Sequence, residues 1–275
     1  MAIFSGRYGS VDGISQIQNW SIDWTMADNP HSNSFTKAGK QRDTGVQDWT
    51  GSFTSEGVLS NVKMSSFELR CQTGGPTFGG GSGVEYSGSA IYTQIGISAD
   101  ISQAGRVIIS CSFSGNGPLT RGTSGSNDTI TPQILYAKDC VVKLGGSVID
   151  WQQFNFTITN EVQTYVGAST VDNEGNVWTH RYPGLYDCSG SLTCTNSEII
   201  GENGMMGELS IVCGGTNLLQ ISNVRLLSTS GISADPSSGA LLGYTANLGM
   251  CAHDDSGQLG VLKLFDSQIW PETAV

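Results

Sequence analysis

The sequence contains few charged side chains, and basic ones are the scarcest. Charged residues make up 13% of the chain, with 13 Lys and Arg against 24 Asp and Glu, so the net charge is −11. Soluble domains normally hold about a quarter of charged residues. A surface that grips nucleic acid needs clustered Lys and Arg to neutralise phosphates. The composition therefore argues against a DNA-gripping protein and favours a neutral polar surface that partner subunits can cover.

Other shortages exclude further classes. No apolar run approaches the 18 or so residues of a transmembrane helix, and the first residues lack the apolar stretch of a signal peptide. The seven cysteines are odd in number and contain no Cys-x-x-Cys spacing, which argues against a zinc or redox motif. We therefore expect buried free thiols in a reducing compartment and no membrane association.

Histidine is also scarce, with His31, His180 and His253 only. A catalytic triad needs a nucleophile, a base and an orienting acid that meet in space, and no Gly-x-Ser-x-Gly elbow is present. These histidines are therefore interpreted as exposed loop residues. The sequence predicts no enzyme and no catalytic residue.

Three segments contain some of the residues of a metal-binding or phosphate-binding loop. Residues 253–255 (His-Asp-Asp) and the pair Asp172 and Glu174 fall short of the ligand set of a calcium loop. The glycine-rich residues 79–83 lack the lysine of a phosphate-binding loop. Exposed acidic turns are the stronger interpretation, so no metal and no cofactor is expected.

A carbohydrate site is the remaining chemical alternative. Asp23 and Asp48 could act as paired carboxylates in glycoside hydrolysis, but both occupy ordinary strand positions. Trp20, Trp24 and Trp49 could stack on sugar rings, yet their alternation with polar residues fits core packing better.

What the chain does contain is an internal repeat. Residues 96–100 and 231–235 both read Gly-Ile-Ser-Ala-Asp, an offset of 135, and residues 48–54 resemble residues 187–193 at an offset of 139. A looser match aligns residues 9–11 with 146–148. Matches in the same order at nearly constant offset indicate a tandem duplication of one domain.

Alternation of apolar and polar residues defines the fold class. It occurs in six segments and predicts strands with one dry and one wet face, as in antiparallel sheets. The segments are residues 19–26, 49–54, 109–114, 154–159, 188–195 and 242–248. We expect an all-β protein with little helix, built from two tandem β-sandwich or partial-barrel domains. Their bounds are 1–125 and 138–275, with a linker at 126–137.

Two long connections, residues 27–47 and 160–184, join corresponding strands of the two copies. Long loops in compact domains are usually functional, and reaching a neighbour is the expected use. The first connection holds the only basic cluster, residues 37–42. Residues 1–137 carry 8 basic and 10 acidic side chains (−2), whereas residues 138–275 carry 5 and 14 (−9). The cluster is either a solvated loop tip or a contact with the acidic half of a neighbour.

Residues 19–23, the polar connection after them and residues 46–54 resemble the start of tailed-bacteriophage major tail tube proteins. Residues 151–159 and 185–195 repeat the scheme, so the resemblance covers both halves. It implies subunits that pair sheet edges and close a barrel around a channel. The duplication implies rings of three chains with pseudo-sixfold symmetry, stacked into a tube through which double-stranded DNA passes without specific binding.

The resemblance further implies a virion protein assembled in the bacterial host cytoplasm, with tape-measure, tail terminator and baseplate proteins as partners. Polar strand faces would line the lumen, and Asp23 and Glu56 are the lumen candidates. Two rival functions remain open. One is a distal tail or baseplate component, and the other is a tandem β-sandwich carbohydrate-binding or adhesin module.

Overall fold

The computed structural model is all-β, as the alternation predicts. Within the described residues, helix is limited to two 3₁₀ turns, η1 (Ala137–Asp139) and η2 (Ala168–Thr170). The structure describes residues 5–11, 17–31, 40–59, 62, 64–74, 83–102, 105–123, 133–195, 204–233 and 243–271.

The described part of the first half contains seven strands. Four of them lie side by side in the order β2-β3-β6-β5. β5 is long and continues beyond this layer. Its first residues pair with β4 and β7 instead, and β4 in turn pairs with β1. The strands are β1 (Ser5–Val11), β2 (Ile17–His31), β3 (Gln41–Ser55), β4 (Phe67–Gly74), β5 (Val84–Asp100), β6 (Ile108–Gly115) and β7 (Thr120–Thr123).

The second half repeats this arrangement in the order β10-β13-β16-β15. Here β15 is the long strand that turns out of the layer to pair with β14 and β17. The strands are β8 (Cys140–Leu144), β9 (Ser147–Ile149), β10 (Trp151–Asn160), β11 (Gln163–Tyr165), β12 (His180–Tyr182), β13 (Tyr186–Cys194), β14 (Met205–Cys213), β15 (Thr216–Ser233), β16 (Gly243–Met250), β17 (Leu262–Leu264) and β18 (Ser267–Trp270).

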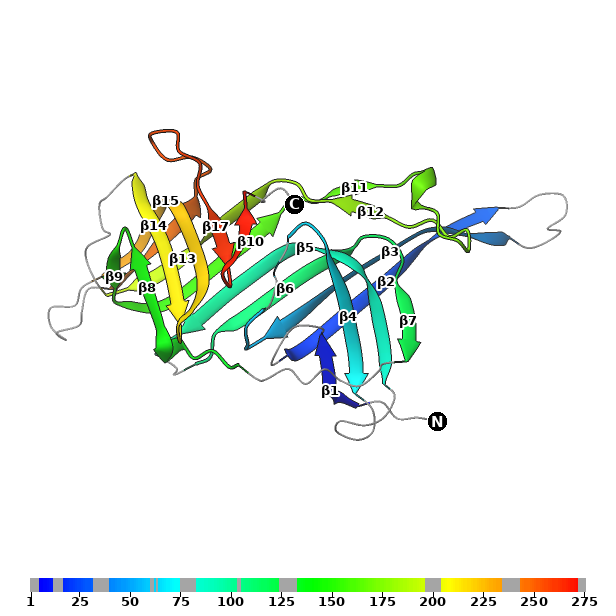
Figure 1. Cartoon of the computed structure of the whole chain (residues 1–275), viewed down its shortest axis with the longest axis horizontal. Helices are drawn as coiled ribbons and strands as arrows, with labels where there is room; N and C mark the ends of the chain where they lie inside the picture. The colour runs from blue at the N-terminus through cyan, green and yellow to red at the C-terminus, as the bar shows by residue number, and fades with distance from the viewer. Residues whose placement is uncertain are drawn as a thin grey trace.

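One antiparallel junction fuses the two four-stranded layers. β5 pairs with β10 from Gln94 opposite Thr159 to Asp100 opposite Gln153. The result is one continuous layer in the order β2-β3-β6-β5-β10-β13-β16-β15 (Figure 1), and hydrogen bonding continues from the first residues of β15 through β14 and β8 to β9. Most of the expected linker lies outside the described residues. Its end returns to the first half, where Ile134 bridges to Gly57.

The two halves share one pairing register. The internal repeat aligns Gly51 of β3 with Gly190 of β13. Both glycines lie unusually close to the backbone of the neighbouring strand. A Cβ at either position would lie 2.3 Å from a carbonyl oxygen, that of Ser21 or of Asn155, so only glycine fits. Counting outward along the ladders gives these equivalent pairs: Trp20/Phe154, Ile22/Phe156, Trp24/Ile158, Phe53/Leu192, Gln94/Ser228, Ile95/Thr229 and Phe113/Leu248.

The registers also correct the sequence alignment. β15 has an irregularity between Ser230 and Ser233, where Gly231 adopts a φ of 68°. This irregularity adds one residue to β15. Before it, residues of β15 correspond to residues of β5 at an offset of 134. After it the offset is 135, which is the offset between the two Gly-Ile-Ser-Ala-Asp segments. The looser match of residues 9–11 with 146–148 is wrong. The former lie in β1, which pairs with β4, and the latter enter β9, which pairs with β8.

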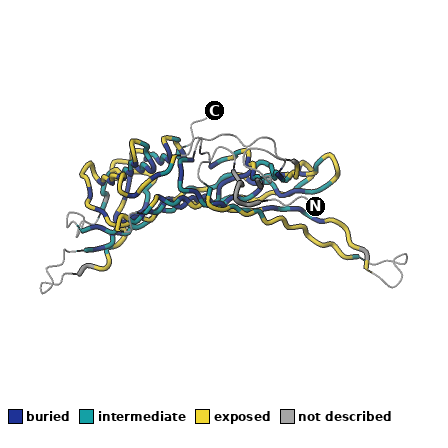
Figure 2. Tube along the Cα trace, turned by 90° about the horizontal axis from the view of Figure 1, so that it is seen from below, coloured by how far each residue is buried: buried dark blue, intermediate teal, exposed yellow. Residues whose placement is uncertain are grey.

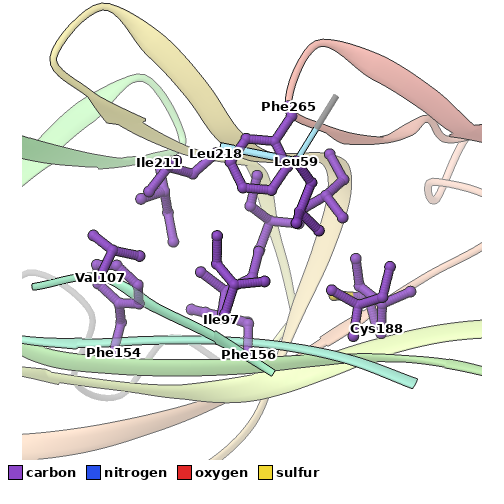
Figure 3. Packing of buried hydrophobic residues seen from close by; sticks show 14 of the residues in the cluster. Leu59, Ile97, Val107, Phe154, Phe156, Cys188, Ile211, Leu218 and Phe265 are labelled. Atoms are coloured by element: carbon purple, nitrogen blue, oxygen red, sulfur yellow. The ribbon is translucent and has the colours of Figure 1, made fainter. Parts of the chain in front are cut away.

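One hydrophobic core spans both halves. Ile97, Phe154 and Phe156 rise from the β5–β10 junction toward Leu59 of the first half and Leu218 of the second (Figure 3). All five side chains are buried. Because burying a side chain of this size stabilises a fold by about 1.5–3 kcal/mol, the junction is part of the core rather than a loose contact between domains.

The sheet is arched. Seen edge-on, it curves so that the covering strands lie on its convex side and its concave side carries no second layer (Figure 2). The apolar positions of the alternating strands face the convex side and are mostly buried, except on the outer strand β2, and their polar neighbours face the open side. This division follows from the period of two along each strand.

Candidate assembly surfaces

The concave face is lined by hydroxyl and amide side chains. Two pairs of hydroxyl oxygens on neighbouring strands are hydrogen-bonded, Ser21 to Ser52 at 3.1 Å and Thr193 to Thr245 at 3.0 Å. One row of directly paired residues crosses five strands: Ser98, Asn155, Ser191, Asn247 and Ser228. Such groups satisfy one another and leave a neutral, hydrated surface.

Basic charge is nearly absent from the eight strands of this sheet. Their sequences contain no lysine, and Arg42 and Arg225 are their only arginines. Arg42 lies in the extension of the β2–β3 hairpin, and Arg225 forms an ion pair of 3.1 Å with Asp255. Little on this face can therefore attract phosphates.

The two expected lumen residues differ in their surroundings. Asp23 is exposed, directly opposite Thr50 of β3. The carboxylate of Glu56 is instead ion-paired with Arg106 and accepts a hydrogen bond from Gln18. Its side chain is only 12% exposed. The charge of Glu56 is thus balanced by a neighbour, which the sequence did not reveal because the two partners are 50 residues apart.

Both ends of the continuous sheet are open edges within the described residues. β2 pairs only with β3, and residues 227–233 of β15 pair only with β16. On β2, Trp24 is 60% and Met26 57% exposed, whereas Ile158, the equivalent of Trp24, is fully buried at the β5–β10 junction. On β15, Leu227 is 62% exposed. Apolar residues on long unpaired edges are typical of surfaces that pair with another strand.

The connection at 160–184 forms an arm that lies on the first half of the chain. β11 and β12 make a separate two-stranded hairpin above β3 (Figure 1). The Gln47 N–H donates to the Val177 carbonyl at 2.8 Å, and the Thr179 N–H donates to the Gln47 carbonyl at 3.0 Å. The ring of Trp178 stacks on Trp24, with centroids 6.4 Å apart and an interplanar angle of 15°. The connection of the second half thus lies over the first half of the same chain, while its expected use in reaching a neighbouring molecule stays a prediction.

An ion pair anchors the arm. Arg181 of β12 donates to both carboxylate oxygens of Asp48, at 2.7 Å and 2.5 Å, and to the Gly115 carbonyl at 2.5 Å. The Arg181 side chain is 8% exposed and that of Asp48 31%. The Arg181 N–H also donates to the side-chain oxygen of Asn116 at 2.7 Å. A buried two-point arginine–carboxylate contact of this kind fixes orientation as well as position.

A second carboxylate shapes the turn of the arm. Asp172 accepts hydrogen bonds from the Trp178 indole at 2.7 Å and from the Asn176 backbone at 2.7 Å, and another from the Glu174 N–H at 3.0 Å. Desolvation acts to raise the pKa of Asp172, but these hydrogen bonds together hold the pKa below its ordinary value. Asp172 is therefore a structural acceptor that holds Trp178 in place.

The other polar candidates are dispersed. His31 contacts Asp43 at 3.2 Å, His180 lies in β12, and His253 bridges to Leu259. Asp254 accepts hydrogen bonds from Ser256 and Gln258 within its own turn. Among the described residues, no group of three or more His, Cys, Asp and Glu side chains could hold a metal ion. The glycine-rich residues 79–83 lie outside the described residues, except Gly83.

The tryptophans do not form a flat platform. Trp49 is buried, and its indole donates to the Gly117 carbonyl at 2.9 Å. Trp20 packs partly buried against the core, so the core interpretation is confirmed for both residues. It is wrong for Trp24, which is exposed because β2 has no outer neighbour. As for the carboxylate pair, Asp48 is committed to Arg181, whereas Asp23 is exposed.

Sequence reasoning missed the Arg181–Asp48 pair. A signal existed, because Arg42 precedes Asp48 by six residues and Arg181 precedes Asp187 by six. The repeat therefore duplicates an arginine and an aspartate together, although the pair that forms in the chain crosses between the copies. Only the docking of the arm reveals which arginine meets which aspartate.

Neither the protein-family models nor the curated proteins contain a match to this chain. In the described part of the chain, no helix has the length and apolar character needed to cross a membrane. The site is therefore interpreted from its geometry, whose main features are a neutral concave face, two open edges and one docked arm.

Proposed function

We propose that the protein is a structural virion protein that polymerises into stacked rings and forms a phage tail tube for DNA delivery. The observation that carries this proposal is the β5–β10 junction. It joins two equivalent four-stranded layers edge to edge, while the equivalents of its two strands, β15 and β2, are open at the ends of the sheet. The same junction can therefore form between the β15 of one chain and the β2 of the next.

Closure of such a ring explains the open edges. Three chains of two layers would give six equivalent layers, and the arch of the sheet supplies curvature of constant sense (Figure 2). A closed barrel leaves no unpaired strand edge that could aggregate. With the covering strands on the convex side, the concave face becomes the lining of the channel.

The lining suits the passage of DNA. Its hydroxyls and amides are neutral, and carboxylates such as Asp23 repel phosphates. Phosphate contacts with Lys and Arg supply most non-specific affinity for DNA, so a lumen without them lets the duplex slide. Tape-measure, terminator and baseplate proteins are the partners that this function requires.

Negative-stain microscopy of the purified protein tests the proposal. The expected result is long hollow tubes of stacked rings. Discrete rings that never stack would favour a distal tail or baseplate component instead. A dispersed monomer that binds glycans would favour the carbohydrate-binding alternative, for which the exposed Trp24 would be the first residue to examine.

A further inference from the structure

We propose that the extended β2–β3 hairpin of one chain docks on the second half of the neighbouring chain, where Arg42 pairs with Asp187 of that neighbour. This inference rests on the proposed ring and adds to it a named interchain contact. The occupant of the Asp187 surface is thus a second copy of this chain.

Within one chain, the arm between β10 and β13 (residues 160–184) crosses the β5–β10 junction and contacts the first half. Its Arg181 reaches Asp48 there. The β2–β3 hairpin occupies the same place in the first half as this arm does in the second. In Figure 1 it extends beyond the end of the sheet instead of folding back over it. If β2 pairs with β15 of a neighbour, the hairpin crosses that junction just as the arm crosses the internal one.

The bases of the two hairpins are built alike. Gly45 and Gly184 each lie three residues after the arginine, and each presses on the opposite strand. A Cβ at Gly45 would lie 2.7 Å from the Ala27 carbonyl oxygen, and one at Gly184 would lie 1.6 Å from the Glu161 carbonyl oxygen. Ala27 and Glu161 share the offset of 134 that relates β2 to β10. Arg42 is therefore the structural counterpart of Arg181.

The receiving corner is also duplicated. In the first half, the Asn116 N–H donates to the Ser89 carbonyl at 2.8 Å, beside the Gly115 carbonyl that accepts from Arg181. In the second half, the Cys251 N–H donates to the Asn223 carbonyl at the same distance. The second half therefore presents the same backbone corner.

The second corner contains the equivalents of both acceptors. Asp187, at the start of β13, is opposite Thr159 of β10. In the same way, Asp48 of β3 is opposite Thr25 of β2. Asp187 is exposed, and among the described residues no ion pair reaches it. Met250 supplies the carbonyl that corresponds to that of Gly115. A guanidinium that docks here would meet the equivalents of the carboxylate and the carbonyl that bind Arg181 at the first corner.

Charge supports the same pairing. Arg42 is 64% exposed in the chain and contacts only Asp28 of its own hairpin among described carboxylates. Lys40 beside it is exposed too. The hairpin belongs to the half with a net charge of −2, and the target half carries −9. Complementary charge of this kind steers subunits into one register.

The junction in the chain also fixes the register between chains. Ile158 is opposite Ile95 and Thr159 is opposite Gln94 at β5–β10. Replacing each residue by its equivalent places Trp24 opposite Thr229 of the neighbour and Thr25 opposite Ser228 of the neighbour. This register buries Trp24 and brings Arg42 to the side of the ring where Asp187 of the neighbour lies.

Crosslinking between two different chains tests the contact. One chain carries Arg42→Cys and the other Asp187→Cys, both with Cys251→Ser, and the polymerised mixture is treated with a short bismaleimide. The expected product is a covalent dimer that requires both chains. A matched mixture with Asp43→Cys in place of Arg42→Cys should give at least about tenfold less of this dimer, because successive residues of a strand point to opposite faces.

Charge reversal provides the second measurement. Arg42→Asp alone and Asp187→Arg alone are each expected to raise the critical concentration for polymerisation about tenfold, and the double reversal should restore it. Tubes that form with no crosslink and no effect of either reversal would overturn the contact and leave the tube proposal intact. If the unaltered chain forms neither rings nor tubes, both proposals are wrong. Circular dichroism of each variant confirms that the exposed substitutions leave the fold intact.

Discussion

At the scale of single residues, the molecule uses charge sparingly, and one ion pair of the described residues joins its two halves. Arg181 is the most deeply buried of the ion-paired basic side chains, and its partner Asp48 belongs to the other half of the chain. A charge buried to this degree is stable only while its partner remains, because desolvation opposes it. The pair therefore specifies where the arm docks more than it adds to total stability.

Replacing Arg181 with alanine should lower the free energy of unfolding by about 3–5 kcal/mol, because Asp48 would be left partly buried without its cation. Chemical denaturation of the unpolymerised chain measures this loss. Arg225→Ala is the matched control, since the Arg225–Asp255 pair is 47% and 73% exposed and should contribute at most about 1 kcal/mol. Equal losses in the two variants would contradict the assigned role of Arg181.

The cysteines give a second prediction at this scale. All seven are free, and six are buried, whereas Cys251 is only partly buried. Burial raises the pKa of the Cys71 thiol to about 12, so almost no reactive thiolate exists there near neutral pH. Brief treatment of the native chain with iodoacetamide at pH 8 should label Cys251 and spare Cys71, as read by mass spectrometry. Comparable labelling of both would show that the core opens readily.

At the scale of elements, the strands were predictable and their partners were not. The alternation in residues 19–26, 49–54 and 154–159 predicts β2, β3 and β10 because a sheet with one dry face imposes a period of two. The pairing of β5 with β10 cannot be predicted in this way, because the alternation within a strand is the same whether or not its edge pairs with another strand. Trp24 was assigned to the core for the same reason, because its pattern matches that of a buried strand although β2 is an edge.

The arm can be tested through the titration of Asp172. Its folded-state pKa lies below the ordinary value, so its hydrogen bonds support docking at pH values above the ordinary aspartate range. That support is lost as the pH falls through the lowered pKa. The protection factors of residues 168–179, which compare measured with intrinsic exchange rates, should therefore fall in acid at pH values that leave the sheet protected. In Asp172→Asn, the protection factors of this segment should already be low at neutral pH and should change little with acid.

At the scale of the whole molecule, the chain contains one edge-to-edge junction between β5 and β10, and the two strands equivalent to them, β15 and β2, are open edges within the described residues. The internal junction buries Phe156 and Ile158, while their equivalents on β2, Ile22 and Trp24, remain partly or largely exposed. This asymmetry between equivalent positions argues that the isolated chain is an incomplete structure. A ring would give every repeat the environment that only the internal junction has now.

Trp24→Lys tests that view at the open edge. Because Trp24 is 60% exposed, the substitution should change the free energy of unfolding by no more than about 1 kcal/mol, yet a lysine facing β15 of the next chain should block pairing. Sedimentation velocity should then show a folded, unpolymerised chain under conditions in which the unaltered chain forms rings. Val148→Lys is the matched control, because Val148 is 61% exposed and lies on β9, which pairs with β8 and is neither of the two strands proposed to join. Normal polymerisation of Trp24→Lys would show that β2 is not the joining edge, and failure of Val148→Lys alone would move the joint to the β8–β9 hairpin.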